Sequence, residues 1–271
     1  MKKNMAKNTI IAKQNFQIVE SINYSKKIQD ALLPTIEDLR QILPHLFIFY
    51  HPKNIVSGDF YWCKKFESHT ILACVDCTGH GVPGAFMSTI GSLILDKITT
   101  ETIISPSEIL SLLNDEIIRI LNQQKDGEIQ DGMDLSICII DHLKKQVSFS
   151  GARNGITLIK NGVATRYKAN LLPVGGNYRK KGKTIDKNFT YVTIDIDEND
   201  WIYMYTDGFI EQIGGPSNMP MNHEQYEQIL CKLSKIDDLD KKIQCLHHEL
   251  DSWKGLNEYT DDMLIMGFKI T

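Results

Sequence analysis

Apolar runs of strand length recur along this chain, and most of them are joined by short turns. The runs at 58–66 and 70–76 are separated by only three polar residues, and Asn161-Gly162 separates another two runs. Asn-Gly favours a tight hairpin because both of its residues accept a positive φ. Hairpins join antiparallel strands, so antiparallel sheets are predicted rather than a doubly wound parallel sheet. The expected strands are 46–50, 58–66, 70–76, 133–141, 146–150, 155–160, 163–167, 189–194, 201–206 and 263–270.

Apolar residues spaced three and four apart predict helices before and between these strands. The first runs from Gln14 to about Leu33, where Pro34 interrupts it, and a short second helix is expected over Ile36 to Leu43. Further helices are expected over 85–98, over 106–121 and, as a pair, between 223 and 253.

Because runs of strands alternate with pairs of helices, the expected fold class is α+β, an antiparallel β-sandwich flanked by helices. An N-terminal helical element precedes it. We divide the chain into this helical linker or regulatory element, 1–43, and a sheet-rich body, 44–271.

The composition excludes several functional classes. The formal charge of −4, without a stripe of Lys and Arg interleaved with aromatics, argues against a nucleic-acid partner. The longest apolar stretches, near 90–95 and 135–140, are far shorter than the roughly 18 residues of a membrane span. Segment 1–14 lacks the apolar core of a secretory signal, and six scattered cysteines do not make a disulfide framework. We therefore expect reduced thiols and a cytoplasmic location.

Aspartates stand at the ends of four separate strand-like runs, each beside a glycine or another small turn residue. They are Asp59, Asp76, Asp207 and the pair Asp261-Asp262. An isolated Asp-Gly is usually an ordinary turn. Several carboxylates that converge from separate strands, however, form the oxygen-rich site that Mg²⁺ and Mn²⁺ prefer. The combination indicates a metal site in a cleft shared by the strand ends.

Five segments that contain or follow these aspartates form an ordered set of motifs. They are VSGDFYW at 56–62, DCTGHGVPGA at 76–85, GARN at 151–154, YTDG at 205–208 and TDDM at 260–263. In this order they resemble the motifs of the SpoIIE-like branch of the PPM metal-dependent serine/threonine protein phosphatases. The resemblance covers the chain from about residue 20 onward. It implies a PPM-type phosphatase domain over 44–271.

The resemblance also implies two Mn²⁺ or Mg²⁺ ions as cofactors. Asp59 and Asp76 would hold or bridge the ions, the backbone carbonyl of Cys77 would be a further ligand, and Asp207 and Asp261 would complete the second site. Asp262 is the alternative to Asp261. We choose Asp261 because the family's metal ligand opens this motif.

A pair of such ions lowers the pKa of a bridging water toward neutrality and screens the phosphate dianion. The implied activity is hydrolysis of phosphoserine or phosphothreonine on a protein in bacterial signalling, and a small partner-switching regulator is one candidate substrate. Two alternatives stay open: a catalytically weak or inactive binding module with this fold, and a phosphatase for nucleotides or other small molecules. Retention of all four aspartates favours the enzyme.

The chain departs from better-known eukaryotic relatives at two motifs. Where those relatives carry a histidine two residues after the metal-binding aspartate, this chain has Thr78. His80 is then the candidate general acid, and the alternative is a turn residue that helps to start the next helix. Ala152 and Arg153 stand where those relatives have an acidic residue that supports a third metal, so we expect two ions.

Other polar residues near these motifs have simpler interpretations. Lys53 is interpreted as a surface lysine rather than a phosphate-orienting cation. Asp131 and Asp134 are interpreted as turn or capping residues and are left out of the metal site. Cys74 and Cys77 form a Cys-x-x-Cys without a second pair, so packing is favoured over a redox or zinc function.

The helix expected from Gln14 to Leu33 has two interpretations. It is either an amphipathic cover for one sheet or, as in this phosphatase branch, an element that links the domain to a sensor or mediates a homodimer. Our hypothesis is a regulatory switch, because the helix and the short helix after Pro34 directly precede the Asp59 strand.

Overall fold

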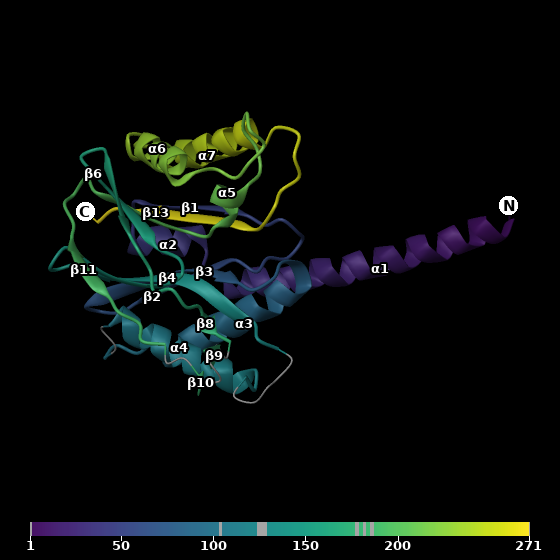
Figure 1. Cartoon of the computed structure of the whole chain (residues 1–271), viewed down its shortest axis with the longest axis horizontal. Coiled ribbons are helices and arrows are strands. Elements are labelled where there is room, and N and C mark those ends of the chain that lie inside the picture. Colours follow the sequence, from purple (N-terminus) through teal and green to yellow (C-terminus); the bar gives the residue numbers. More distant parts are fainter. Residues whose placement is uncertain are drawn as a thin grey trace.

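Two antiparallel sheets face each other at the centre of the molecule (Figure 1). The computed structural model describes residues 2–102, 105–123, 129–176, 179–180, 183–184 and 187–270. The first sheet has the strand order β1-β13-β12-β6-β7. Its strands are β1 (Leu46–His51), β13 (Met263–Phe268), β12 (Trp201–Tyr205), β6 (Ile156–Lys160) and β7 (Val163–Tyr167).

The second sheet has the strand order β11-β5-β4-β3-β2, and a short strand β8 (Val174–Gly175) also pairs with β4. Its long strands are β11 (Val192–Asp195), β5 (Gln146–Ala152), β4 (Gly132–Asp141), β3 (His69–Cys77) and β2 (Phe60–Lys65). Strands β9 (Arg179–Lys180) and β10 (Lys183–Thr184) form a separate small hairpin.

Helices cover the outer face of each sheet, which gives four layers (Figure 1). Helices α3 (Gly81–Ile98) and α4 (Pro106–Ile120) pack on the second sheet. Helices α6 (His223–Ser234) and α7 (Leu239–Lys254) pack on the first. The short helix α2 (Ile36–Ile42) contacts β1, and one turn of helix, α5 (Gly208–Glu211), follows β12.

Three apolar clusters fill the spaces between the layers. The central cluster lies between the sheets and contains Leu72, Phe149 and Met266. The other two lie under the helix pairs, where Leu113 packs on the second sheet and Leu246 on the first. Burial of these side chains provides most of the drive to fold, and it holds the ends of strands from both sheets close together.

These layers confirm the expected α+β fold with flanking helices. The hairpin of β2 and β3 is confirmed by their antiparallel pairing. At the turn between β6 and β7, Asn161 and Gly162 both have positive φ, 52° and 76°. Strand β11 begins at Val192 rather than at 189, because Thr190 hydrogen-bonds with the side chain of Asn170 instead of joining the ladder. The short elements β8, β9, β10 and α5 were not predicted.

The N-terminal helix α1 (Lys2–Leu32) extends away from the layered body (Figure 1). It begins well before the expected Gln14, because residues 2–13 include helix formers such as lysine and alanine and contain no Pro or Gly. Residues 7–21 are all exposed, so the interpretation of α1 as a cover for one sheet is wrong for this part. None of the helices among the described residues is long and apolar enough to cross a membrane.

Candidate active site

Acidic side chains from four remote segments meet at one end of the two sheets. A cavity of about 230 Å³ is lined by Asp76 at the end of β3, Asp207 after β12, and Asp261 and Asp262 before β13. Asp59, directly before β2, lies behind this lining and is only 2% exposed. The structure therefore brings together all four aspartates that the sequence predicts, together with Asp262.

Two glycines allow the loop after Asp76 to approach the loop before β2. A Cβ atom at Gly84 would lie 2.2 Å from the carbonyl oxygen of Gly79 and 2.8 Å from Cα of Gly58. A Cβ atom at Gly58 would lie 2.6 Å from the same oxygen of Gly79. Real side chains do not tolerate such distances to backbone atoms, so the close approach requires glycine at both positions.

Asp59 is held by hydrogen bonds from three sides. The Thr206 hydroxyl donates to Oδ2 of Asp59 at 2.7 Å. The backbone amide of Asp59 donates to Oγ of Ser57 at 3.0 Å, and the Tyr50 hydroxyl donates to the Asp59 carbonyl at 3.1 Å. Burial raises the pKa of Asp59 well above its ordinary value despite the Thr206 bond, and the neighbouring carboxylates raise it further.

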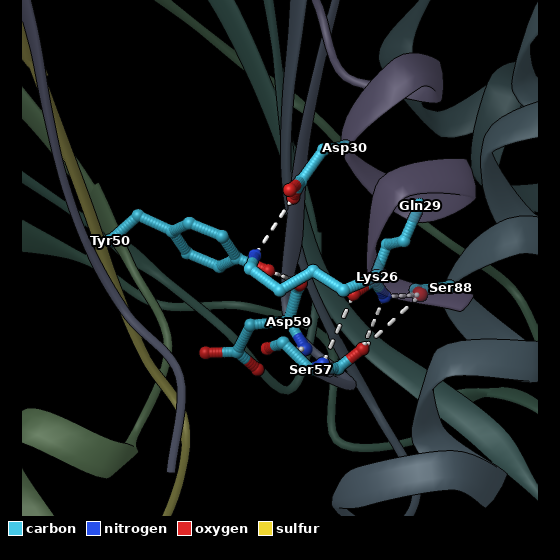
Figure 2. A network of polar contacts seen from close by, with 7 residues as sticks. All are labelled: Lys26, Gln29, Asp30, Tyr50, Ser57, Asp59 and Ser88. Atoms are coloured by element: carbon cyan, nitrogen blue, oxygen red, sulfur yellow. Dashed lines mark hydrogen bonds and ion pairs between the residues drawn. The ribbon is translucent and has the colours of Figure 1, made fainter. Parts of the chain in front are cut away.

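The segment that leads into Asp59 also connects to the end of α1, as Figure 2 shows. The side-chain amide of Gln29 donates to the Ser57 carbonyl at 2.7 Å and to Oγ of Ser88 on α3 at 2.8 Å. Its oxygen accepts from the Ser57 amide at 3.1 Å. Gln29, Ser57 and Ser88 are all buried. One glutamine of α1 therefore fixes the backbone two residues before Asp59.

The carboxyl groups around the cavity are strongly coupled. Burial, followed by the charge of Asp59, raises the pKa of Asp76 to about 10. Burial, followed by the charges of Glu211 and Asp261, raises the pKa of Asp207 to about 6, and Asp207 shares a hydrogen bond with Asp76. Two carboxyl groups that hydrogen-bond to each other must share a proton unless a cation replaces it. Buried carboxyl oxygens are the donors that hard divalent cations bind.

These donors fit a divalent metal in chemical type, but their spacing is not that of a finished ligand cluster. Among the described residues, no group of three or more His, Cys, Asp or Glu side chains is spaced to hold a metal ion. Cys77 lines the same cavity, and burial raises the pKa of its thiol well above the ordinary value. A neutral thiol is a poor ligand for a hard cation, so the backbone carbonyl is the better donor at this residue.

Asp261 and Asp262 have different environments. Asp262 is 3% exposed, and its two carboxylate oxygens accept hydrogen bonds from the backbone amides of Lys53, at 2.7 Å, and Gly58, at 2.8 Å. Asp261 is partly exposed and accepts from the backbone amide of Asp262 at 2.8 Å. The occupied oxygens of Asp262 favour Asp261 as the metal ligand.

His80 lies at the rim of the same cavity and is exposed. It precedes α3 at the N-cap position, and its Nδ1 shares a hydrogen bond with Oδ1 of Asn54 at 2.9 Å. Both interpretations of this residue, a proton donor and a helix-start residue, fit the position.

Thr78 is structural, because its hydroxyl accepts from the Gly132 amide and donates to the Gly132 carbonyl. Lys53 is not among the described residues that line the cavity.

Asp134 corrects one interpretation from the sequence. It is a residue of β4, not of a turn, and it pairs in register with Asp76 of β3. Its side chain lines the cavity and forms an ion pair with Arg153 at 3.2 Å. Burial raises the pKa of Asp134 to about 6 although Arg153 lowers it. The sequence did not reveal this role because it depends on the register between β3 and β4.

The two cysteines of the Cys-x-x-Cys have the expected packing role. Both are free thiols and buried. Cys74 lies in the central cluster with Leu72, and Cys77 lies in the cluster under α3 and α4. Burial raises the pKa of both thiols, which opposes the thiolate form that redox chemistry or zinc binding needs.

Comparison with protein families assigns most of the chain. Residues 67–271 match the family model described as stage II sporulation protein E (SpoIIE). No sequence among the curated proteins matches this chain.

Several solved structures have the same fold. The SiaA-PP2C domain of Pseudomonas aeruginosa superposes with a TM-score of 0.85 and 24% identity, over 95% of this chain and 99% of that one. The PP2C phosphatase domain with a fragment of the regulatory domain of SpoIIE from Bacillus subtilis gives a TM-score of 0.65 and 22% identity, over 83% and 61%. The RsbU and RsbW domains of a Mycobacterium tuberculosis protein give 0.63 and 17%, over 84% and 60%. At these identities the similarity establishes the fold.

Proposed function

This chain belongs to the SpoIIE family, a branch of the PPM protein phosphatases, and we propose on that premise that it hydrolyses phosphoserine and phosphothreonine on a protein substrate with two Mn²⁺ or Mg²⁺ ions. One observation carries the proposal. Asp59, Asp76, Asp207 and Asp261, which are remote in sequence, gather at one cavity between the ends of two sheets. A fold that needed only a stable core would not collect buried carboxylates whose charges repel.

The ions would be held by oxygen atoms of five residues. Asp59 and Asp76 would bind or bridge them, the carbonyl of Cys77 would add a ligand, and Asp207 and Asp261 would complete the second position. When bound, the ions supply an activated water near neutral pH and neutralise charge on the phosphoryl group.

The remaining residues position these ligands and handle the leaving group. Thr206 orients Asp59 through the bond to Oδ2. Asp262 fixes the segment from Lys53 to Gly58 by accepting from the backbone amide at each end. His80, exposed at the rim, would donate a proton to the departing serine or threonine oxygen. We assign this proton transfer to His80 as part of the proposal.

The names of related structures support a signalling role. One relative combines RsbU and RsbW domains in one chain, and another is named as the cell-fate determinant SpoIIE. We propose a phosphorylated regulator of a partner-switching pathway as the substrate of this chain. We place the activity in the cytoplasm, and the six free cysteines support a reducing compartment.

The element 1–43 is proposed as a regulatory linker that forms a homodimer through α1. The exposed residues of α1 include Ile11, Phe16, Ile18 and Val19, whose side chains are 44% to 63% exposed. An isolated helix of this kind is only marginally stable in water, so a partner helix would stabilise it. Replacing Phe16 and Val19 together with Glu tests this. A fall in oligomeric mass by light scattering supports the dimer, and an unchanged mass refutes it.

The activity itself is tested with an aryl phosphate, with Mn²⁺ present and with chelator added. Turnover that requires the metal supports the phosphatase, whereas no turnover favours the catalytically inactive binding module. A phosphoserine peptide and a nucleoside monophosphate, compared at equal concentration, then separate a protein phosphatase from a small-molecule phosphatase. The proposal expects a higher kcat/KM for the peptide.

A further inference from the structure

The candidate active site has an excess of negative charge. Five aspartates line its cavity, Asp76, Asp134, Asp207, Asp261 and Asp262. The substrate of a phosphatase brings a further dianion, and two divalent ions offset only part of this charge. Among the described residues that line the cavity, Arg153 is the only arginine or lysine.

The backbone at Arg153 is held in an unusual conformation. Arg153 follows β5 and has a φ of 62°, in the left-handed region that a residue with a side chain rarely adopts. Its amide donates to the Asn170 carbonyl at 2.8 Å, and the Asn170 amide donates to the Gly151 carbonyl at 2.9 Å. The turn is therefore fixed from both sides. Strained conformations that the surroundings enforce concentrate at functional sites.

The guanidinium group of Arg153 is anchored without being covered. Nη1 forms an ion pair with Oδ2 of Asp134 at 3.2 Å. The Asp134 side chain is 20% exposed, whereas the Arg153 side chain is 55% exposed. A guanidinium carries five N–H donors in a planar fork, so one ion pair leaves donors for another anion. Asp134, a residue of β4, thus orients the guanidinium group of Arg153.

Arg153 also lies where two cavities join. A second cavity, of about 390 Å³, shares Asp134, Arg153 and Asp207 with the first. Its other lining includes Arg166 of β7 and Lys168, which directly follows β7. A phosphorylated side chain that entered from the second cavity toward the aspartates would pass the guanidinium group of Arg153.

We propose that Arg153 binds the non-bridging oxygens of the substrate's phosphoryl group, and that Asp134 holds the guanidinium in position for this contact. The proposal rests on the proposed function, because it names a substrate-binding residue of that site. Arginine suits the task because its fork matches two phosphate oxygens at once. The simpler interpretation is an ion pair that only compensates the charge of Asp134.

The test uses the full chain and inorganic phosphate as the probe, with Mg²⁺ present. Calorimetry gives the dissociation constant of phosphate, and an aryl phosphate assay gives kcat and KM. The variants are Arg153→Ala, Arg153→Lys and, as a matched loss of one exposed, ion-paired arginine away from both cavities, Arg119→Ala on α4. Thermal unfolding of each variant checks that it is folded.

We expect Arg153→Ala to weaken phosphate binding and to raise KM by roughly 10-fold to 100-fold, as loss of a charge-assisted hydrogen bond does. Arg153→Lys should recover part of this loss, and Arg119→Ala should change neither value. An unchanged phosphate dissociation constant in Arg153→Ala would overturn the proposal.

A double variant separates binding from simple charge compensation. If Arg153 only compensates Asp134, the double change Asp134→Asn with Arg153→Ala restores wild-type phosphate binding, and the proposal fails. If Arg153 binds phosphate, the double variant stays as weak as Arg153→Ala. Phosphate binding is measured without turnover, so its loss is distinguishable from a failure of the phosphatase activity itself.

Discussion

Gln29, near the end of α1, forms hydrogen bonds with both the backbone amide and the backbone carbonyl of Ser57 (Figure 2). The two residues are 28 positions apart in the chain. Because Ser57 in turn accepts from the amide of Asp59, this contact links the N-terminal helix to a candidate metal ligand through one intervening residue.

Replacement of Gln29 by Ala should therefore affect both folding and metal binding. The Ser57 amide would be left buried without its acceptor, which costs about 1–3 kcal/mol of unfolding free energy. We also expect a higher Mn²⁺ concentration for half-maximal activity, because the backbone before Asp59 loses its anchor. Urea unfolding and a Mn²⁺ titration measure the two effects. Gln14→Ala, an exposed Gln on the same helix, is the control. Equal behaviour of the two variants would contradict this role of Gln29.

Gly84→Ala tests the close approach of the two loops. The added Cβ would meet backbone atoms of Gly79 and Gly58, which cannot move independently. We expect a loss of stability of about 2 kcal/mol or more from this overpacking, even though alanine favours helix. Gly91→Ala in the same helix is the matched control, because its new Cβ would meet mainly the flexible side chain of Met133. Thermal unfolding should show the larger decrease for Gly84→Ala, and a reversed order would contradict the account.

Substitutions at Asp261 and Asp262 should have different effects, one on metal binding and the other on stability. Asp261→Asn is expected to weaken Mn²⁺ binding about tenfold or more with little change in unfolding, since a charged ligand is lost. Asp262→Ala leaves the amides of Lys53 and Gly58 without acceptors, so it should cost about 2 kcal/mol of unfolding free energy or more. Calorimetry with Mn²⁺ and urea unfolding measure the two changes. The opposite pattern would identify Asp262 as the ligand.

Lys242 gives the protein a pH dependence that is unrelated to the active site. This side chain is fully buried, its Nζ donates to the Leu233 carbonyl, and it lies 3.7 Å from the centre of the Trp201 ring. Burial, followed by the charge of Lys269, lowers the pKa of Lys242 from 10.5 to about 8. Between these two values the unfolded chain binds more protons than the folded chain, so the Lys242 contribution to stability rises with pH.

Comparison with Lys242→Met isolates this effect. From about pH 8 to pH 10.5 the wild type should gain stability relative to the variant, by up to about 1.4 kcal/mol per pH unit. Below pH 8 the difference should stay constant. Urea unfolding of both proteins at several pH values provides the data. A difference that is independent of pH throughout would show that Lys242 keeps its ordinary pKa in the fold.

Much of this fold could be predicted from local patterns in the sequence. Alternation of apolar residues located the long strands, and Asn161-Gly162 located a hairpin, because both depend on neighbours in sequence. The four predicted aspartates were recognised for the same reason, since each lies in a short motif at a strand end.

The features that the sequence did not reveal depend on contacts between distant segments. Asp134 lines the cavity only because β3 and β4 pair in one particular register. Gln29 meets Ser88 across 59 positions, and nothing in the local pattern of α1 indicates this partner. The start of α1 was predicted too late because the apolar spacing that indicates the helix begins near Gln14, whereas residues 7–13 continue the helix with every side chain exposed.

The central claim is that aspartates from separate strands bind the metal ions that make this chain a phosphatase. Calorimetric titration of the full chain with Mn²⁺, together with aryl phosphate hydrolysis in the same buffer, tests it most directly for the wild type, Asp59→Asn and Asp207→Asn. The account predicts two bound ions and metal-dependent turnover for the wild type, and loss of at least one ion with about a 100-fold or greater fall in kcat/KM for each variant. Turnover that persists in chelator, or that is the same in all three proteins, would contradict it.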